Sequence, residues 1–262
     1  MSRRWSFRIL VPALFLIGRF GMAQAAPWDI EAPKACTSTA TVLCLNNRFL
    51  VSFAWLVHEQ DLGGFATAVA LTSDTGYFWF NSANNVELVI KAVDGRAFNN
   101  FFWVFFGALT NVEYLITVTD TVTGRVKTYF SQQGTVRSVS DTAAFNASAG
   151  PPPNANVSGI WDAVGDNRGD PSSGLVLTLS QTGTSVSGTF SIVDDPSVTG
   201  AITGTVSGQS VSVTAIASSA GGSCSTSGTL FVVPDNSIMR GVFPDNHCNE
   251  GGGITILTAA KR

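Results

Sequence analysis

Short apolar segments separated by turn residues recur along the chain, and this pattern predicts strands rather than helices. Val86, Leu88 and Ile90 alternate with Glu87 and Lys91, as expected for a strand with one face in water. Turn residues such as Asp94-Gly95 predict tight connections. Seven short strands in about a hundred residues are typical of an immunoglobulin-like β-sandwich. These strands are expected near residues 48–57, 66–72, 76–80, 86–93, 101–109, 112–121 and 124–130.

The run from Phe101 to Phe106 lacks this alternation. It predicts either a central strand covered on both faces or a strand whose second face is an exposed platform. Flat rings on an exposed face would stack on sugars or apolar chains, whereas a sandwich also needs large inward side chains, which favours a place in the core. Five aromatic side chains are expected on one sheet face: Tyr77, Trp79, Phe101, Trp103 and Phe105.

The C-terminal part of the chain has a more regular pattern. Eight hairpin-linked strands are expected, with Thr182-Gly183 and Gly208-Gln209 as two-residue turns. A glycine recurs inside successive strands, and glycine permits the sharp coiling by which a sheet closes on itself. The pattern predicts a small closed antiparallel β-barrel. Its strands are expected near residues 159–165, 175–182, 185–193, 201–207, 210–217, 224–233, 238–244 and 252–259.

A proline-rich break separates the two regions. The segment from Ala149 to Asn154 contains three consecutive prolines, which cannot join a central strand and favour an extended spacer. Aromatic residues crowd the strands before it, and Gly, Ser, Thr and Val dominate after it. The sequence therefore predicts an all-β protein with a β-sandwich domain at residues 36–145, a linker at 146–158 and an eight-stranded β-barrel domain at 159–262.

The first 25 residues have the three parts of a secretory signal peptide. A basic start, Met1 to Arg8, precedes an apolar run, Ile9 to Gly18, which is too short for a permanent membrane anchor. An Ala-Gln-Ala site follows, and cleavage is expected after Ala25 or Ala26. The pair Arg3-Arg4 partly matches a twin-arginine signal, so both the general and the twin-arginine routes stay open. We expect a periplasmic or extracellular protein with no membrane span in its mature chain.

The charge of the mature chain argues against nucleic acid as a partner. Four of the 15 basic residues and none of the 18 acidic ones lie in the signal segment, so 11 basic residues remain and the net charge falls from −3 to about −7. An acidic surface repels phosphate backbones and anionic lipid headgroups.

All four cysteines lie in the expected mature chain, and an even number in an oxidising compartment predicts disulfides. Three pairings are possible. Cys36 with Cys44 and Cys224 with Cys248 keeps each bridge inside one domain, and the barrel meander also brings Cys248 beside Cys224. No Cys-x-x-Cys is present and the two histidines are far apart in the sequence, so neither a metal nor another cofactor is expected.

Two resemblances add to these predictions. At Gly159-Ile160-Trp161 the barrel resembles lipocalin and avidin-type barrels, which also carry Gly-x-Trp on their first strand. The resemblance implies that Trp161 plugs one barrel end, with Arg240 as its basic counterpart, and that the barrel encloses a small apolar ligand. The N-terminal region resembles an uncharacterised β-domain of exported bacterial proteins, through residues that include Leu43-Cys44-Leu45 and the segment Asp74 to Phe80.

Three segments invite a catalytic or metal-binding interpretation. Asp74-Thr75-Gly76 matches the catalytic tripeptide of aspartic proteases, but a second copy is missing and a turn between two strands explains it. His58 and Glu59 are adjacent, so on a strand they would point to opposite faces, and both histidines are expected at the surface. Asp166 to Asp170 lacks the ligand spacing of a calcium loop and is expected to be a polar loop.

These observations favour an exported, non-enzymatic binding or accessory protein of the bacterial cell envelope. One hypothesis places a small apolar ligand in the barrel, near Trp161 and Arg240. A second places a glycan or an envelope protein on the aromatic sheet, at Tyr77, Trp79 and Trp103. A third, less favoured hypothesis is a hydrolase that uses Asp74.

Overall fold

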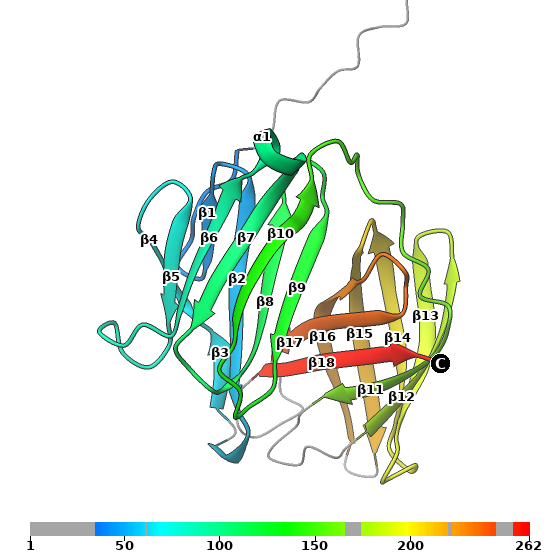
Figure 1. Cartoon of the computed structure of the whole chain (residues 1–262). Helices are drawn as coiled ribbons and strands as arrows, with labels where there is room; N and C mark the ends of the chain where they lie inside the picture. The colour runs from blue at the N-terminus through cyan, green and yellow to red at the C-terminus, as the bar shows by residue number, and fades with distance from the viewer. Residues whose placement is uncertain (1–34, 61, 166–173, 220–221, 245–253) are drawn as a thin grey trace, which may run out of the picture. The chain divides into compact units, whose positions relative to one another are not determined.

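The computed structural model describes residues 35–60, 62–165, 174–219, 222–244 and 254–262. The expected signal peptide, the loop from Asp166 to Asp170, His247 and Cys248 lie outside these residues. Almost every regular element is a strand, as predicted (Figure 1). The exceptions are the 3₁₀ turn η1 (His58–Gln60) and the short helix α1 (Arg96–Asn99). No helix in the described ranges is long and apolar enough to cross a membrane.

Two five-stranded antiparallel sheets form the N-terminal sandwich. The order in the first sheet is β1-β2-β8-β9, with β3 also paired to β2, and the order in the second sheet is β10-β7-β6-β5-β4. The first sheet contains β1 (Val42–Leu45), β2 (Phe49–Val57), β3 (Leu62–Phe65), β8 (Glu113–Asp120) and β9 (Val126–Ser131). The second sheet contains β4 (Thr67–Ala70), β5 (Thr75–Trp79), β6 (Leu88–Asp94), β7 (Phe101–Ala108) and β10 (Ser138–Asn146).

The core of the sandwich lies between these sheets. The ring of Phe49 contacts that of Phe102 at a centroid distance of 5.2 Å, and the ring of Phe53 lies 5.7 Å from that of Phe78. All four side chains are buried. Aromatic side chains from both sheets therefore meet in this core, and their large apolar area contributes much of its energy.

All seven strands predicted for this region are present, and the structure adds β1, β3 and β10. The strand β7 does alternate, because Phe102, Val104 and Phe106 point into the core and the residues between them do not. Of the two alternatives predicted for this strand, the structure therefore has the strand with one face outside the core and not the strand covered on both faces.

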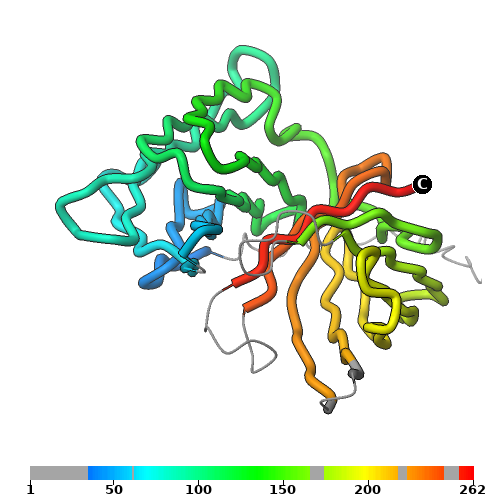
Figure 2. The backbone as a smooth tube through the Cα atoms, turned by 90° about the horizontal axis from the view of Figure 1, so that it is seen from below, coloured from blue at the N-terminus to red at the C-terminus, as the bar shows by residue number. Residues whose placement is uncertain are grey.

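The C-terminal region is a closed eight-stranded antiparallel barrel, as predicted. Its first and last strands lie side by side and close the sheet (Figures 1 and 2). Every strand begins and ends within two residues of its predicted bounds. The strands are β11 (Gly159–Gly165), β12 (Gly174–Thr182), β13 (Ser185–Ile192), β14 (Thr199–Ser207), β15 (Ser210–Ser219), β16 (Gly222–Val232), β17 (Ile238–Pro244) and β18 (Ile254–Lys261).

Glycines inside these strands allow the close coiling of the barrel. A Cβ at Gly200 would overlap both the carbonyl oxygen of Ile216 and the ring of Phe190. At Gly228 a Cβ would lie 2.6 Å from the carbonyl oxygen of Val242. Any side chain at these positions would push neighbouring strands apart, which supports the role predicted for the repeated glycines.

The segment between β10 and β11 is packed against the barrel. Ala155 and Val157 are buried in the hydrophobic cluster of the barrel. The backbone nitrogen of Ala155 donates to the carbonyl oxygen of Gly208, and that of Val157 donates to Oε1 of Gln181 at 2.9 Å. This segment therefore closes the barrel end at which the hairpin turns lie. The division into two folding domains at this segment stays a prediction.

Residues Pro33–Arg262 form one compact unit. The outer face of the first sheet contacts the outside of the barrel through a small cluster of buried apolar side chains: Ala54, Leu56, Leu115, Ile254 and Ile256. Periodicity within single strands did not predict this contact, because it depends on how the two regions pack together.

The disulfide Cys36–Cys44 forms as predicted, with the two Cα atoms 5.5 Å apart. It ties the chain before β1 to β1 itself. Cys224 is also disulfide-bonded.

Candidate functional site

The closed end of the barrel is filled by side chains rather than left open. Trp161 has no exposed surface, and its indole Nε1 donates a hydrogen bond to the carbonyl oxygen of Val157 at 2.9 Å. Met239 is fully buried in the same cluster. Trp161 therefore fills this end of the barrel, beneath the segment that precedes β11.

The basic counterpart of Trp161 is Lys261 and not Arg240. The Nζ of Lys261 lies 5.5 Å from the centroid of the Trp161 ring. Arg240 follows Met239, which points into the barrel, so its own side chain points outward. The guanidinium of Arg240 lies 5.7 Å from the centroid of the Phe130 ring, on a strand of the sandwich. The role that the resemblance implies for Arg240 is therefore wrong because of strand alternation.

Aromatic side chains gather on the outer face of the second sheet. Tyr77 and Trp79 flank the inward-pointing Phe78 on β5, and all three outward positions of β7 that the sequence singled out are half-buried. The exposed Phe98 of α1 joins them. We call this surface the aromatic face; it comprises Tyr77, Trp79, Phe98, Phe101, Trp103 and Phe105.

Trp103 is held rigidly at one end of this face. Its indole Nε1 donates to Oδ1 of Asn99 at 2.8 Å. A Cβ at Gly95 would overlap the indole ring, so the ring packs directly against the backbone there. The ring of Phe98, which is 81% exposed, lies 5.4 Å from that of Trp103. A ring fixed in this way loses little conformational entropy when a ligand covers its free surface.

The aromatic face continues diagonally across the sheet. The ring of Phe105 lies 6.1 Å from that of Trp103, and Nζ of Lys91 lies 5.2 Å from the Phe105 centroid. Cross-strand pairing then places Val89 next to Tyr77. Trp103 and Tyr77 are two strands and two side-chain rows apart, which corresponds to roughly 15–20 Å at ordinary strand spacing. The face is thus elongated, and it mixes flat rings with a cation.

Asp74, the aspartate of the protease-like tripeptide, is held in a turn by its neighbours. The carboxylate of Asp74 accepts hydrogen bonds from the hydroxyls of Thr72 at 2.6 Å and Thr75 at 2.9 Å. These two bonds lower the pKa of Asp74 and hold it ionised in the turn between β4 and β5. Within the ranges that the structure describes, no group of three or more His, Cys, Asp or Glu side chains is placed to hold a metal ion.

His58 is not a surface residue, because it lies in a 3₁₀ turn instead of a strand and turns toward β8. Its side chain is 16% exposed, and its Nε2 lies 3.1 Å from Oε2 of Glu113. Burial raises the pKa of Glu113, and the neighbouring His58 offsets part of that rise. Glu59 instead accepts hydrogen bonds from Nε2 of Gln133. The pairing of His58 with Glu113, which are 55 residues apart, was not predictable from local sequence patterns.

The fold defines the class of this protein, which is a β-sandwich joined to a closed antiparallel β-barrel. No protein-family model, no curated protein and no solved structure matches this chain.

Proposed function

We propose that this chain is an exported, non-enzymatic binding protein of the bacterial cell envelope, and that its aromatic face binds carbohydrate chains. The observation that carries the proposal is the rigid, partly exposed Trp103, which continues into a row of outward rings. The flat apolar surface of an aromatic ring fits the C–H face of a sugar ring.

The shape of the aromatic face favours a chain of sugars over a single sugar. Rings lie at both ends of a diagonal of roughly 15–20 Å, with Lys91 between them. Successive sugar rings of an extended chain can cover such a row, while hydroxyl groups of the chain accept hydrogen bonds from the lysine.

The barrel interior is a poorer candidate for the binding site than the aromatic face. Its closed end is filled by Trp161, Met239 and the buried Val157 of the preceding segment. A small apolar ligand at that end would have to displace well-packed side chains, and close packing makes such displacement costly.

Export is part of the proposal. The basic, apolar and small-residue parts of the first 25 residues support a cleaved signal. The disulfide Cys36–Cys44 is compatible with it, because such bonds persist in oxidising compartments.

The test is binding of the mature chain to a panel of soluble polysaccharides by affinity electrophoresis. We expect at least one polysaccharide to retard the protein, and Trp103→Ala to weaken that binding by about tenfold or more. The matched control is Phe65→Ala, which removes an exposed ring from β3 of the other sheet and should leave binding unchanged. Equal loss in both variants, or no retardation by any polysaccharide, would contradict the proposal.

A further inference from the structure

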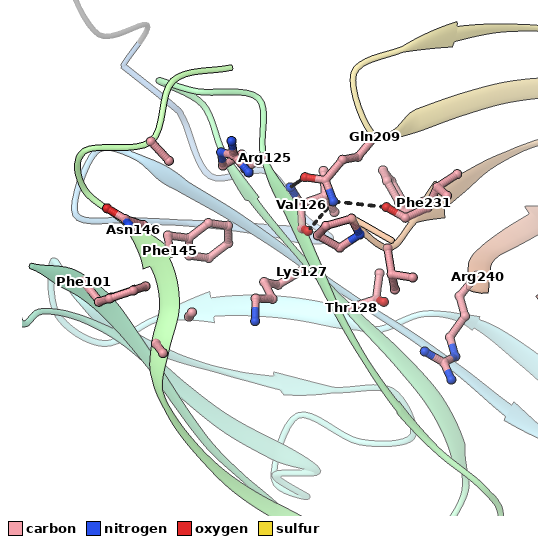
Figure 3. A pocket seen from close by; sticks show the side chains of 16 residues that line it. Phe101, Arg125, Val126, Lys127, Thr128, Phe145, Asn146, Gln209, Phe231 and Arg240 are labelled. Atoms are coloured by element: carbon pink, nitrogen blue, oxygen red, sulfur yellow. Dashed lines mark hydrogen bonds between the residues drawn. The ribbon is translucent and has the colours of Figure 1, made fainter. Parts of the chain in front are cut away.

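A second feature, separate from the aromatic face, is a cavity of about 390 Å³ between the sandwich strands β9 and β10 and the outside of the barrel (Figure 3). This volume is within the usual range for small-molecule sites. Among the described residues that line the cavity, three are cations and none is acidic. The cations are Arg125 and Lys127 of the sandwich and Arg240 of the barrel.

Arg240 lacks a counter-charge in the described part of the chain. Its Nε is buried without a hydrogen-bond partner. The guanidinium of the neighbouring Arg137 donates to the carbonyl oxygen of Phe130 at 2.7 Å and adds a second positive charge. Burial lowers the pKa of Arg240, and the charge of Arg137 lowers it further. The hydroxyl oxygen of Thr258, the cross-strand partner of Arg240, is also buried without a partner.

The remaining cations are only partly neutralised. Nζ of Lys127 lies 3.3 Å from a carboxylate oxygen of Asp141, whereas Nε of Arg125 donates to the carbonyl oxygen of Gly150. A neutral acceptor leaves the guanidinium charge in place. The cavity is therefore positive overall, and an anion inside it would meet donors that have no protein acceptor.

Apolar side chains form much of the rest of the wall. Phe145 comes from β10, Phe231 from β16, and Pro234 follows β16. Gln209 holds the two sides together, because its Oε1 accepts from the backbone nitrogen of Val126 at 3.2 Å and its Nε2 donates to the carbonyl oxygen of Val232 at 3.1 Å (Figure 3).

We propose that this cavity binds a small amphipathic anion, with its carboxylate toward Arg240 and its apolar body against Phe145 and Phe231. The partly buried, unpaired guanidinium is the feature that points to a ligand. An arginine in this position is costly in the empty protein, because its charge is partly desolvated and, among the described residues, faces the ring of Phe130 but no carboxylate. A bound carboxylate supplies the missing acceptor and forms a charge-assisted hydrogen bond.

The experiment measures binding of decanoate to the mature chain by isothermal titration calorimetry, below the concentration at which decanoate forms micelles. Decanol is the matched neutral ligand. We expect decanoate to bind and decanol to bind at least about tenfold more weakly. Arg240→Met should weaken decanoate binding by about 30-fold or more. Arg262→Met removes an exposed arginine that pairs with Asp162 and should leave binding unchanged.

Unfolding by urea separates this role from a purely structural one. Because Arg240 is unpaired in the empty protein, Arg240→Met should unfold at the same urea concentration as the wild type or at a higher one. Loss of decanoate binding without loss of stability supports the site. Absent decanoate binding, equal affinity for decanoate and decanol, or unchanged decanoate affinity in Arg240→Met would overturn it, whatever the outcome for polysaccharides.

Discussion

Replacing Asp120 by Ala should strongly destabilise the sandwich, since this carboxylate has several partners and almost no exposed surface. Its two oxygens each accept a hydrogen bond of 2.7 Å from Arg48. It also accepts from the backbone nitrogen of Val122 and the hydroxyl of Thr123. The Arg48 guanidinium lies 4.1 Å from the centroid of the Phe102 ring, so the ion pair adjoins the aromatic core.

The magnitude follows from burial. The side chain of Asp120 is 1% exposed and that of Arg48 is 18% exposed, so removal of the carboxylate leaves a largely buried cation without its partner. Breaking a buried pair in this way costs about 3–5 kcal/mol. The pair Asp94–Arg96 offers a matched control, because it has the same chemistry but both side chains are about half exposed. Asp94→Ala should change stability little.

The effect should also depend on pH. Burial pushes the pKa of Asp120 upward, but the hydrogen bonds from Arg48 and Thr123 and the charge of Arg48 outweigh it, so the pKa is lowered. A carboxyl whose pKa is lower in the folded chain stabilises the fold above its unfolded pKa of about 3.9 and loses that contribution as the pH falls toward the folded value. The stability difference between wild type and Asp120→Ala should therefore shrink below about pH 4.

The differences in unfolding free energy between the wild type and each variant are measured by urea unfolding, with tryptophan fluorescence as the signal, from about pH 3 to about pH 8. Equal losses in Asp120→Ala and Asp94→Ala at neutral pH would refute the argument from burial. A difference between wild type and Asp120→Ala that grows as the pH falls would refute the assigned pKa direction.

Three further variants test the packing. Gln209→Leu leaves the backbone nitrogen of Val126 without its acceptor and should lower the free energy of unfolding by about 1–3 kcal/mol, measured by urea unfolding. Gly200→Ala places a Cβ against the Ile216 carbonyl and should cost about 1–3 kcal/mol or more, whereas a melting temperature equal to that of the wild type would contradict the close coiling. Val157→Ala removes packing at the filled end of the barrel and should lower the free energy of unfolding by about 1–3 kcal/mol, measured by urea unfolding. Its control, Val122→Ala, shortens an exposed side chain and should leave the free energy of unfolding almost unchanged.

The barrel was predictable because its signals are local. The hairpins β12–β13 and β14–β15 turn at Gly183 and Gly208, as their sequences predicted, and alternation assigns the inner face of a strand such as β14. Two of the three strands that the prediction missed, β3 and β10, carry weak local signals. The strand β3 is Leu-Gly-Gly-Phe, and β10 is mostly polar at its start, so packing against neighbouring strands decides their structure.

The candidate site was predictable in part. The five aromatic residues of the strands were singled out from the sequence, but the place in the core that was favoured for them differs from the structure, because their strands turn these positions away from the core. Arg240 was assigned from a resemblance, although its position next to the inward Met239 already implied the opposite face. The roles of Gln209 and Lys261 depend on contacts between distant segments, for which single-strand patterns carry no signal.

The most direct test of the proposed function is an NMR titration of the mature chain that follows the indole N–H signals of its tryptophans. The ligand is an oligosaccharide derived from a polysaccharide that retards the protein in affinity electrophoresis. The Trp103 signal should shift, since this indole lies on the aromatic face. The Trp161 signal should stay in place, since its N–H is bonded to Val157 inside the barrel. A shift of the Trp161 signal with the Trp103 signal unchanged would contradict binding at the aromatic face and return the binding site to the barrel.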